Sequence, residues 1–401
     1  MRGLLRCRPF PVRAFSADFH RVGGSGEQLS GTVIKGEVVR QAVDLRQLRP
    51  GDVLDIPYEL TVSTAFRDFW QACFHANDRI NTSTPFARSL GFQDSLLPVP
   101  MMLFLSGSMS HADAAKVQVG FKNAICHWPT FAGDTFTRRF QVKSRRTTTD
   151  GDHSIFTFGC SLQNQRGKTV FTCDKTMLFP FPLDENTEAV FEGESPPPED
   201  LREHLIVRAG SMADKLRSHS LTPLRPGQLI LHSMSRPLSS TRSMQLSSLA
   251  RLTHERHFNH HVFDTEEIYI PGGLVLGLTI SAASRDLHEV LHEDIVECSF
   301  INNLHPGDTV GAMTFISSLG ENVSGDMESL TIRTVGVKNM DVHRELKDVA
   351  LPIELFTGNV KRPRDYEQLC MEKVPMLQNK IVSCLERRIL RQAPKAEAFL
   401  L

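Results

Sequence analysis

The sequence predicts an α+β fold made of two tandem copies of one unit, in which a long helix lies against an antiparallel sheet. Two short words recur in the same order. Leu48-Arg49-Pro50-Gly51 returns as Leu224-Arg225-Pro226-Gly227, and Gly133-Asp134-Thr135 returns as Gly307-Asp308-Thr309 at nearly the same spacing. Common turn residues could produce one such match, whereas matches in one order at nearly one spacing favour an internal repeat.

The N-terminal segment differs in kind from the rest of the chain. Its opening stretch, MRGLLRCRPFPVRAFSA, holds four arginines and no acid, and the first acid is Asp18. Such a composition is typical of a mitochondrial transit peptide. We therefore assign residues 1–25 to a transit peptide and expect the protein in the mitochondrial matrix. A basic disordered tail is the alternative.

Residues 40–183 form the first predicted unit. The stretch from Ser63 to Ala76 places Phe66, Phe69, Trp70 and Cys73 on one side of a helix, and its start recurs as Ser239-Ser240. An apolar helix is expected over about residues 100–109, and strands are expected over 136–142, 154–162 and 168–178. One long helix followed by a run of antiparallel strands implies the α+β class.

A second unit is predicted over residues 220–358, with its long helix over about 274–284. Residues 184–219 between the units include EGESPPPED and read as a polar linker. Residues 359–401 are basic, and we expect them to form a helical C-terminal extension, with a helix over about 366–392. This extension could pack on the core or bind a partner.

Composition excludes several classes of function. The chain has 401 residues with 45 Lys+Arg and 46 Asp+Glu, so no basic field favours nucleic acid. The eight cysteines form no CxxC pair, which indicates a reducing compartment. No run approaches the ~18 apolar residues of a membrane-spanning helix.

Several segments resemble the MaoC-like dehydratases, a family whose fold is two hot-dog units in one chain. The resemblance spans roughly residues 45–355 and is carried by residues 83–91 (STPFARSLG), 94–97 (DSLL) and 256–262 (RHFNHHV). The nearest likeness is to mesaconyl-CoA hydratases, also called methylmalyl-CoA dehydratases. The resemblance implies two tandem hot-dog units, the first shaping an acyl pocket and the second carrying the catalytic groups.

A second likeness is to the mitochondrial type 2 hydroxyacyl-thioester dehydratase of fatty-acid synthesis. Its catalytic segment reads roughly Asn-x-His-x-x-His-aromatic-Asp, and the stretch from Leu252 to Asn259 here reads LTHERHFN. Both histidines and the aromatic residue match. Leu252 stands where Asn or Asp is expected, and Asn259 replaces the final Asp.

Hydration of an enoyl thioester requires a group that activates water, a proton donor for the α-carbon and stabilisation of the enolate oxygen. We assign the first two tasks to His257, assisted by His254, with the Asn259 amide holding water or the imidazole. A polar surface or structural histidine is the alternative for His257. Four histidines at 254, 257, 260 and 261 also suggest a metal, but no cysteine or acidic set completes a recognisable site, so none is expected.

In this family, backbone N–H groups at the start of the long helix usually hold the enolate oxygen. Here Gly272 and Gly273 open that helix and would let a thioester carbonyl approach free amides, where the helix dipole favours negative charge. A plain strand-to-helix turn is the alternative. At the repeat offset, the first copy has Asn81 in place of His257, so that half is expected to lack catalytic groups. The arginines at 138, 139, 145 and 146 could meet substrate phosphates or lie at solvated strand edges.

These features predict a cofactor-free enoyl-thioester hydratase or 3-hydroxyacyl-thioester dehydratase, a carbon–oxygen lyase. The expected partner is an acyl-CoA or acyl-carrier-protein thioester of fatty acid metabolism, and a homodimer is allowed. The rival hypothesis is a catalytically inactive hot-dog protein that binds acyl thioesters or acts as a scaffold. Leu252, in place of a polar residue, favours this rival.

Overall fold

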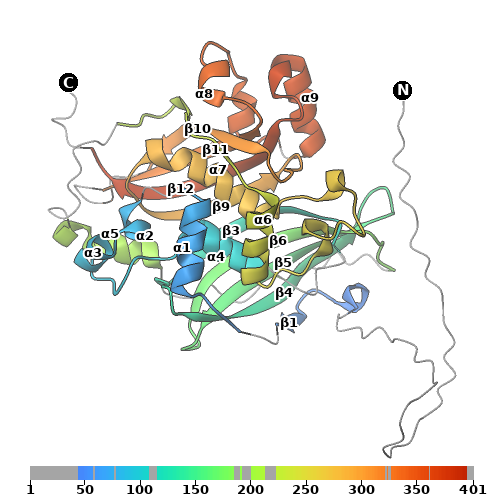
Figure 1. The fold of residues 1–401 in the computed structure, drawn as a ribbon, viewed down its shortest axis with the longest axis horizontal. Helices are drawn as coiled ribbons and strands as arrows, with labels where there is room; N and C mark the ends of the chain where they lie inside the picture. Colours follow the sequence, from blue (N-terminus) through green and yellow to red (C-terminus); the bar gives the residue numbers. More distant parts are fainter. Residues whose placement is uncertain are drawn as a thin grey trace, which may run out of the picture. The chain divides into compact units, whose positions relative to one another are not determined.

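One continuous antiparallel sheet organises the chain (Figure 1). The computed structural model describes residues 44–56, 59–75, 78–107, 115–184, 190–191, 200–212, 223–320, 323, 327–360 and 362–394. Within them twelve strands pair, and the main path runs β1-β4-β5-β6-β3-β9-β12-β11-β10-β7, with β2 on β4 and β8 on β10. The predicted transit peptide, residues 1–25, lies outside the described residues.

The first five strands of this path and the helices before them form the N-terminal unit. Its elements are β1 (Val53–Asp55), β2 (Leu60–Thr61), α1 (Thr64–Cys73), α2 (Arg79–Thr82), α3 (Thr84–Ser89), α4 (Val99–Gly107), β3 (Val117–Cys126), β4 (Thr135–Thr147), β5 (Ser154–Asn164) and β6 (Thr169–Phe179). Ser63 is the N-cap of α1, and its Oγ accepts a hydrogen bond from the amide of Phe66 at 3.1 Å. The two predicted helices and the three predicted strands are confirmed.

The C-terminal unit repeats this order. Its elements are β7 (Leu229–Leu231), β8 (Arg236–Pro237), α6 (Ser240–Leu249), two 3-10 helices (Glu255–His257 and Thr265–Glu267), α7 (Gly272–Leu287), β9 (Val290–Phe300), β10 (Thr309–Leu319), β11 (Met327–Lys338), α8 (Val342–Glu345), a third 3-10 helix (Ile353–Phe356), α9 (Pro363–Lys373), a fourth 3-10 helix (Pro375–Leu377) and β12 (Ile381–Gln392). The strand order β7-β10-β11-β12-β9 matches β1-β4-β5-β6-β3 strand for strand. The predicted α+β fold of two tandem hot-dog units is confirmed.

The prediction of a helical extension over residues 359–401 is wrong. Only α9 is an α-helix in the described part of that segment, and residues 381–392 form β12, which pairs with β9 on one side and β11 on the other. Its basic residues are not all solvated: the Arg387 and Arg391 side chains are buried and bind Glu293 and Glu328. The C-terminal unit therefore extends to Gln392 and not to 358, because residues 339–380 are inserted between β11 and β12.

The inserted segment covers one face of the C-terminal half of the sheet. Met340, Leu346, Phe356, Tyr366 and Leu377 pack with residues of β10, β11 and β12 in one apolar cluster. Helix α7 contacts the same strands within separate clusters. In the N-terminal unit the corresponding strands β5 and β6 join through a short turn, and alternate residues of β4, β5 and β6 are buried or part-exposed.

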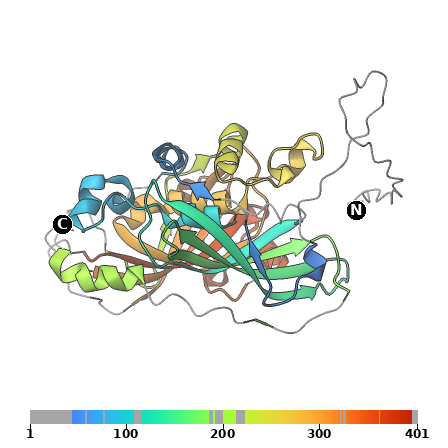
Figure 2. The ribbon, with the colours of Figure 1, turned by 90° about the horizontal axis from the view of Figure 1, so that it is seen from below.

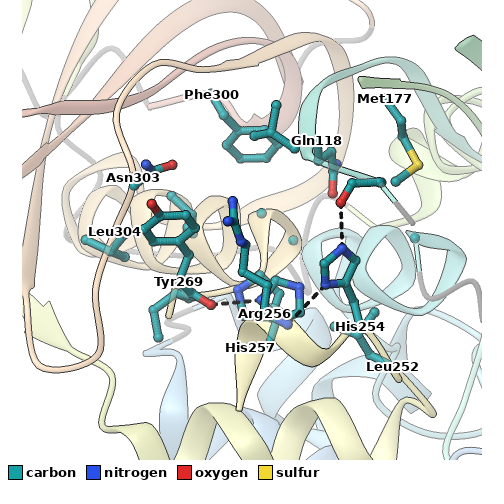
Figure 3. Close-up of a pocket in the computed structure, with 18 of the residues that line it drawn as sticks. Gln118, Met177, Leu252, His254, Arg256, His257, Tyr269, Phe300, Asn303 and Leu304 are labelled. Carbon is teal, nitrogen blue, oxygen red and sulfur yellow. Dashed lines mark hydrogen bonds between the residues drawn. The ribbon is translucent and has the colours of Figure 1, made fainter. Parts of the chain in front are cut away.

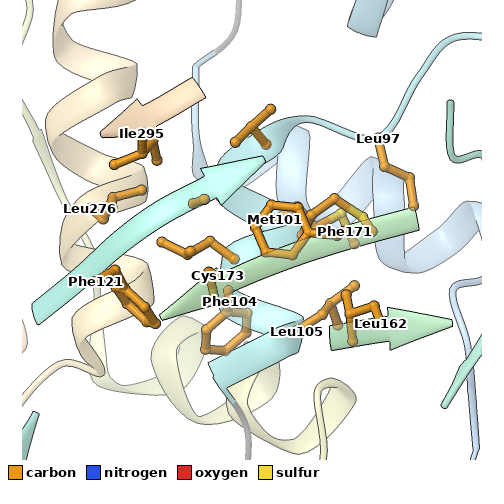
Figure 4. Packing of buried hydrophobic residues seen from close by; sticks show 14 of the residues in the cluster. Leu97, Met101, Phe104, Leu105, Phe121, Leu162, Phe171, Cys173, Leu276 and Ile295 are labelled. Atoms are coloured by element: carbon orange, nitrogen blue, oxygen red, sulfur yellow. The ribbon is translucent and has the colours of Figure 1, made fainter. Parts of the chain in front are cut away.

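The two units meet where β3 pairs with β9, and their long helices α4 and α7 pack together (Figures 2 and 4). Lys122 and Glu297, which occupy equivalent positions in the two repeats, pair with each other at this seam and form an ion pair of 3.0 Å. Equivalent residues that face one another indicate a pseudo-twofold axis at the seam. Figure 4 shows Phe104 and Leu105 of α4 and Leu276 of α7 in the shared core.

The predicted linker, residues 184–219, contains a helix, α5 (Leu201–Met212). Leu201 and Leu205 are buried, and α5 contacts β9, so this part of the linker packs on the domain. Among the described residues, no helix combines the length and the apolar character needed to cross a bilayer.

Candidate functional site

A cavity of about 110 Å³ opens between the two units and brings together the predicted catalytic segment and the start of α7 (Figure 3). The C-terminal unit contributes His254, His257, Gly272 and Gly273 to its lining. The N-terminal unit contributes residues at the end of α4 and on the inward faces of β3 and β6. Each unit therefore builds one side of the same site.

Local turns after α6 position the two histidines. Arg251 adopts φ +60°, and the amide of Leu252 returns to the carbonyl of Ser247 at 2.8 Å, which ends the helix. A 3-10 turn, Glu255–His257, follows and sets the rings of His254 and His257 5.4 Å apart, centroid to centroid. Both rings border the cavity, and Leu252 lines it beside them.

His257 is held with one ring nitrogen available to a substrate. Its Nδ1 lies 2.8 Å from the carbonyl oxygen of Tyr269 and can donate a hydrogen to it (Figure 3). In the neutral ring Nε2 is then the acceptor. Burial, followed by the proximity of His254, lowers the pKa of His257 to about 3. The imidazole is therefore neutral near pH 7 and able to accept a proton.

His254 has both ring nitrogens engaged. Its Nε2 lies 2.7 Å from the carbonyl oxygen of Ala115, at the entry to β3, and its Nδ1 accepts from the amide of Arg256 at 3.2 Å. Burial lowers the pKa of this histidine below its usual value. His254 therefore ties the 3-10 turn Glu255–His257 to the other unit, and His257 is the histidine with a ring nitrogen left to act as a base.

Two glycines bring the first turn of α7 to the cavity. A Cβ on Gly272 would lie 2.9 Å from the ring of Phe300, and a Cβ on Gly273 would lie 3.0 Å from Phe104. The amides of Leu274 and Val275 bind the carbonyl of Pro271, whereas the amides of Gly272 and Gly273 have no acceptor among the described residues. They are free donors at the positive end of the helix dipole.

The structure does not bring Asn259 into this site. Its amide nitrogen donates to Glu255 Oε1 at 3.2 Å, and its oxygen accepts from the amide of His261 at 3.0 Å. Asn259 does not line the cavity, so its predicted role in holding water is not supported by its position. Two of the four arginines considered for substrate phosphates, Arg138 and Arg145, have another role. Both are buried, and they bind the carbonyl oxygens of Ala250 and Arg46.

Sequence reasoning missed the cavity residues that come from the N-terminal unit. Lys175 of β6 and Gln118 of β3 both line it. Lys175 is buried, and its Nζ donates to the carbonyl of Gly107 at 2.5 Å. The alternation of buried and part-exposed residues along β6 could have indicated Lys175, because Cys173, Lys175 and Met177 lie on the same, buried face of the strand.

A second, smaller cavity of about 40 Å³ occupies the equivalent place beside α4. Asn81 stands there for His257, and its Nδ2 donates to the carbonyl of Leu96 at 3.0 Å, as His257 donates to Tyr269. Asp78 stands for His254 and accepts from the amide of Val290, at the entry to β9, at 2.9 Å. Pro100 stands for Gly273 and has no N–H. The expected lack of a catalytic histidine at position 81 thus coincides with loss of an amide donor.

Burial and two nearby carboxylates, Glu293 and Glu289, raise the pKa of Asp78 to about 7, against the Val290 amide and Arg387, which lower it. His292 also lines this second cavity. This histidine comes from β9 of the C-terminal unit and not from the N-terminal unit, to which Asn81 belongs. Its Nε2 lies 3.0 Å from Asp294 Oδ1. Among the described residues, no group of three or more His, Cys, Asp or Glu side chains is placed to hold a metal ion.

Comparisons with known proteins identify the fold. No model of a known protein family matches the sequence, and no curated protein matches it either. A MaoC domain dehydratase from Chloroflexus aurantiacus is similar in structure, with 17% identity, a TM-score of 0.68 and coverage of 90% of this chain and 100% of that one.

A conserved hypothetical protein from Mycobacterium tuberculosis with a double hotdog fold aligns at 15% identity and a TM-score of 0.64, over 86% of this chain and 96% of its own. A third structure, a MaoC-like dehydratase, aligns at 12% identity and a TM-score of 0.56, over 87% of this chain and 100% of that one. At these identities the likenesses show that the chain has the double hot-dog fold of such proteins.

Proposed function

We propose that this protein is an enoyl-thioester hydratase, reversible as a 3-hydroxyacyl-thioester dehydratase, with one active site per chain. The observation that carries the proposal is the pairing of His257, neutral with an accepting Nε2, and the free amides of Gly272 and Gly273 around one cavity. A base and a pair of backbone donors are the two components that addition of water to an enoyl thioester requires.

The steps follow from these groups. His257 Nε2 takes a proton from water as the water oxygen bonds to the β-carbon, and the electrons of the double bond move to the thioester oxygen. The amides of Gly272 and Gly273 donate to that oxygen and stabilise the enolate. The imidazolium then returns its proton to the α-carbon. Because Nδ1 stays bonded to the Tyr269 carbonyl, the ring keeps one orientation throughout.

The finer assignments are also proposals. Resemblance to mesaconyl-CoA hydratases supports a short, branched acyl group, and a cavity of about 110 Å³ suits one. Lys116 and Arg256 line the cavity as basic residues that suit the phosphates of coenzyme A or of an acyl carrier. The arginine-rich N-terminus supports import into mitochondria, and N-terminal sequencing of the protein from its source would detect the cleavage. The molar mass of the protein in solution, measured by light scattering, would test the expected homodimer.

One observation favours the inactive rival. The cavity lining includes Leu252 where relatives carry a polar residue, and it includes no carboxylate among the described residues. Such a site could bind an acyl thioester without activating water. Under this hypothesis the protein binds saturated thioesters and hydrates none.

The test is loss of enoyl absorbance with crotonyl-CoA and mesaconyl-CoA. His257→Ala should lower turnover at least the ~10²-fold that a lost general base costs. Asn81→Ala, at the equivalent position of the N-terminal unit, is the matched control and should leave turnover within a few-fold. A wild-type protein that binds butyryl-CoA but hydrates neither enoyl thioester would establish the rival.

A further inference from the structure

Lys175 places a buried cation against the acyl cavity. It is 3% exposed, and burial lowers the pKa of its ammonium. In the described part of the chain it forms no ion pair with a carboxylate, and the ionisable groups that interact with its charge are the thiols Cys160 and Cys173 and the imidazoles of His254 and His257. A buried ammonium with one carbonyl partner retains unused donors.

Gln118 supplies a second unused donor at the same cavity. Its Nε2 is buried and has no hydrogen-bond partner in the described structure. Its Oε1 lies 3.2 Å from the place that a Cβ of Gly272 would occupy, so the side chain sits beside the first turn of α7. Figure 3 shows Gln118 near His254 on the wall of the cavity. Buried donors without partners are rare and indicate a missing acceptor.

The equivalent position in the other half shows what such an acceptor looks like. In the repeat, Gln118 corresponds to Glu293 of β9. Arg387, on the strand equivalent to β6, donates to Glu293 Oε2 from Nε at 2.8 Å and from Nη2 at 2.5 Å. There an internal carboxylate neutralises the basic residue beside a cavity of only 40 Å³. At the larger cavity a neutral amide replaces that carboxylate, and the cation remains.

We propose that Lys175 and Gln118, both from the N-terminal unit, bind a carboxylate on the acyl group of the substrate. The inference rests on the proposed function and adds to it two specificity-determining residues for an acyl carboxylate of the kind that the test substrate mesaconyl-CoA carries. The substrate carboxylate would take the place that the Glu293 carboxylate holds in the equivalent half. Binding then pairs this carboxylate with the Lys175 ammonium, which the fold has already removed from water. Neutral acyl groups of the same size leave Lys175 unpaired and bind more weakly.

Fumaryl-CoA and crotonyl-CoA form the matched substrate pair, because a carboxylate in one replaces a methyl group in the other. We expect the wild type to prefer fumaryl-CoA at least tenfold in kcat/KM. Lys175→Met should lower kcat/KM for fumaryl-CoA roughly 10²-fold, the loss expected for one desolvated charged hydrogen bond, and leave crotonyl-CoA within threefold. Lys122→Met, an exposed lysine on β3, is the control and should change neither.

Gln118→Glu keeps Lys175 and tests the proposal without removing it. The new carboxylate copies Glu293, neutralises the ammonium and should abolish the preference for fumaryl-CoA. If Lys175 served only to bind the carbonyl at the end of α4, Lys175→Met would lower the stability of the protein. Gln118→Glu would then leave the ratio of kcat/KM for fumaryl-CoA to that for crotonyl-CoA unchanged. Equal losses on both substrates, or no preference in the wild type, would overturn the proposal and leave the hydratase assignment standing.

Binding separates this proposal from the hydratase assignment itself. If the wild type hydrates neither substrate, the proposed function fails, and calorimetry with the saturated pair succinyl-CoA and butyryl-CoA decides the inference. Tighter binding of succinyl-CoA, lost in Gln118→Glu, would support the carboxylate subsite. Equal affinities for the two thioesters would exclude it.

Discussion

The two cavities beside α4 and α7 occupy equivalent places, and three of the groups that differ between them bear on the proposed chemistry. His257, Gly273 and Gln118 line one cavity and correspond to Asn81, Pro100 and Glu293. Asn81 and Glu293 line the other cavity, and Pro100 follows the lining residue Val99 in α4. The first two pairs keep their local contact or position and change the chemistry, whereas Gln118 Nε2 lacks a partner in the described structure and Glu293 is bound by Arg387. Asn81 and His257 both donate to a backbone carbonyl, and Pro100 and Gly273 both lie in the first turn of a helix.

This difference shows how a fused repeat can specialise. The interactions that hold each turn in place survive in both halves, whereas the base, the amide donor and the open cation survive in one. Both cavities draw on both units, so the N-terminal unit, which has Asn81 in the position of His257, still forms a wall of the cavity that contains this histidine. Three experiments test this comparison.

The largest expected effect comes from giving the C-terminal site the proline of the other half. Proline fits the first turn of a helix but has no N–H, so Gly273→Pro removes one donor to the enolate oxygen. We expect kcat for hydration roughly 10² to 10³-fold below that of Gly273→Ala. The alanine variant keeps the amide and meets the same crowding from Phe104, which isolates the donor. Equal rates in the two variants would show that these amides do not stabilise the enolate.

A smaller effect is expected from Asp78, whose pKa is raised to about 7 in the folded protein. Between about pH 4 and 7 the folded state holds a proton that the unfolded state has released. Stability from this group is therefore highest at low pH and is lost as pH rises through 7. Release of the Asp78 proton as the pH rises from 5 to 8 should lower the free energy of unfolding by roughly 2 to 3 kcal/mol.

Asp78→Asn keeps an oxygen for the Val290 amide and cannot titrate, so urea unfolding of this variant should lack that loss. His257 acts in the opposite direction, because its pKa is lowered to about 3 and its contribution is lost as pH falls below about 6.5. The difference between wild type and Asp78→Asn isolates the carboxyl. If that difference is the same at pH 5 and pH 8, Asp78 does not hold a proton.

The smallest effect concerns the helix caps that the two halves share. Ser63 Oγ accepts from the amide of Phe66 at 3.1 Å, and Ser239 Oγ accepts from the amide of Arg242 at 3.3 Å. Ser63→Ala and Ser239→Ala should each lower the free energy of unfolding by about 1 kcal/mol. Because both units share one sheet, both variants should shift one urea transition. Two separate transitions would show that the units unfold independently.

The repeated words predicted the two-unit fold because they encode local conformation. Gly51 and Gly227 adopt φ +97° and +81°, and Gly133 and Gly307 adopt φ +98° and +95°. Each pair of turns therefore requires glycine for the same steric reason. His257, Gly272 and Gly273 also line one cavity in the structure. The family resemblance had indicated both the turn that carries His257 and the start of the long helix.

The features that the sequence did not predict depend on distant contacts. Residues 381–392 were expected in a basic helix, and their strand form depends on pairing with β9 and β11 and on the contacts of the buried Arg387 and Arg391 with Glu293 and Glu328. The insertion before it also ends the nearly constant spacing that revealed the other repeated elements. Lys175 and Gln118 were missed for a related reason: they lie on β6 and β3, far in sequence from the 3-10 turn that carries the histidines, and only the joined sheet brings them to one cavity.

The insertion between β11 and β12 has a consequence for synthesis on the ribosome. β12 lies between β9 and β11, yet it is the last strand in chain order within the described residues. Until residue 392 has been translated, β9 and β11 each present an unpaired edge of N–H and C=O groups. The C-terminal unit therefore completes its sheet only after synthesis has passed the whole insertion, and a chain stalled in α9 exposes two strand edges to aggregation.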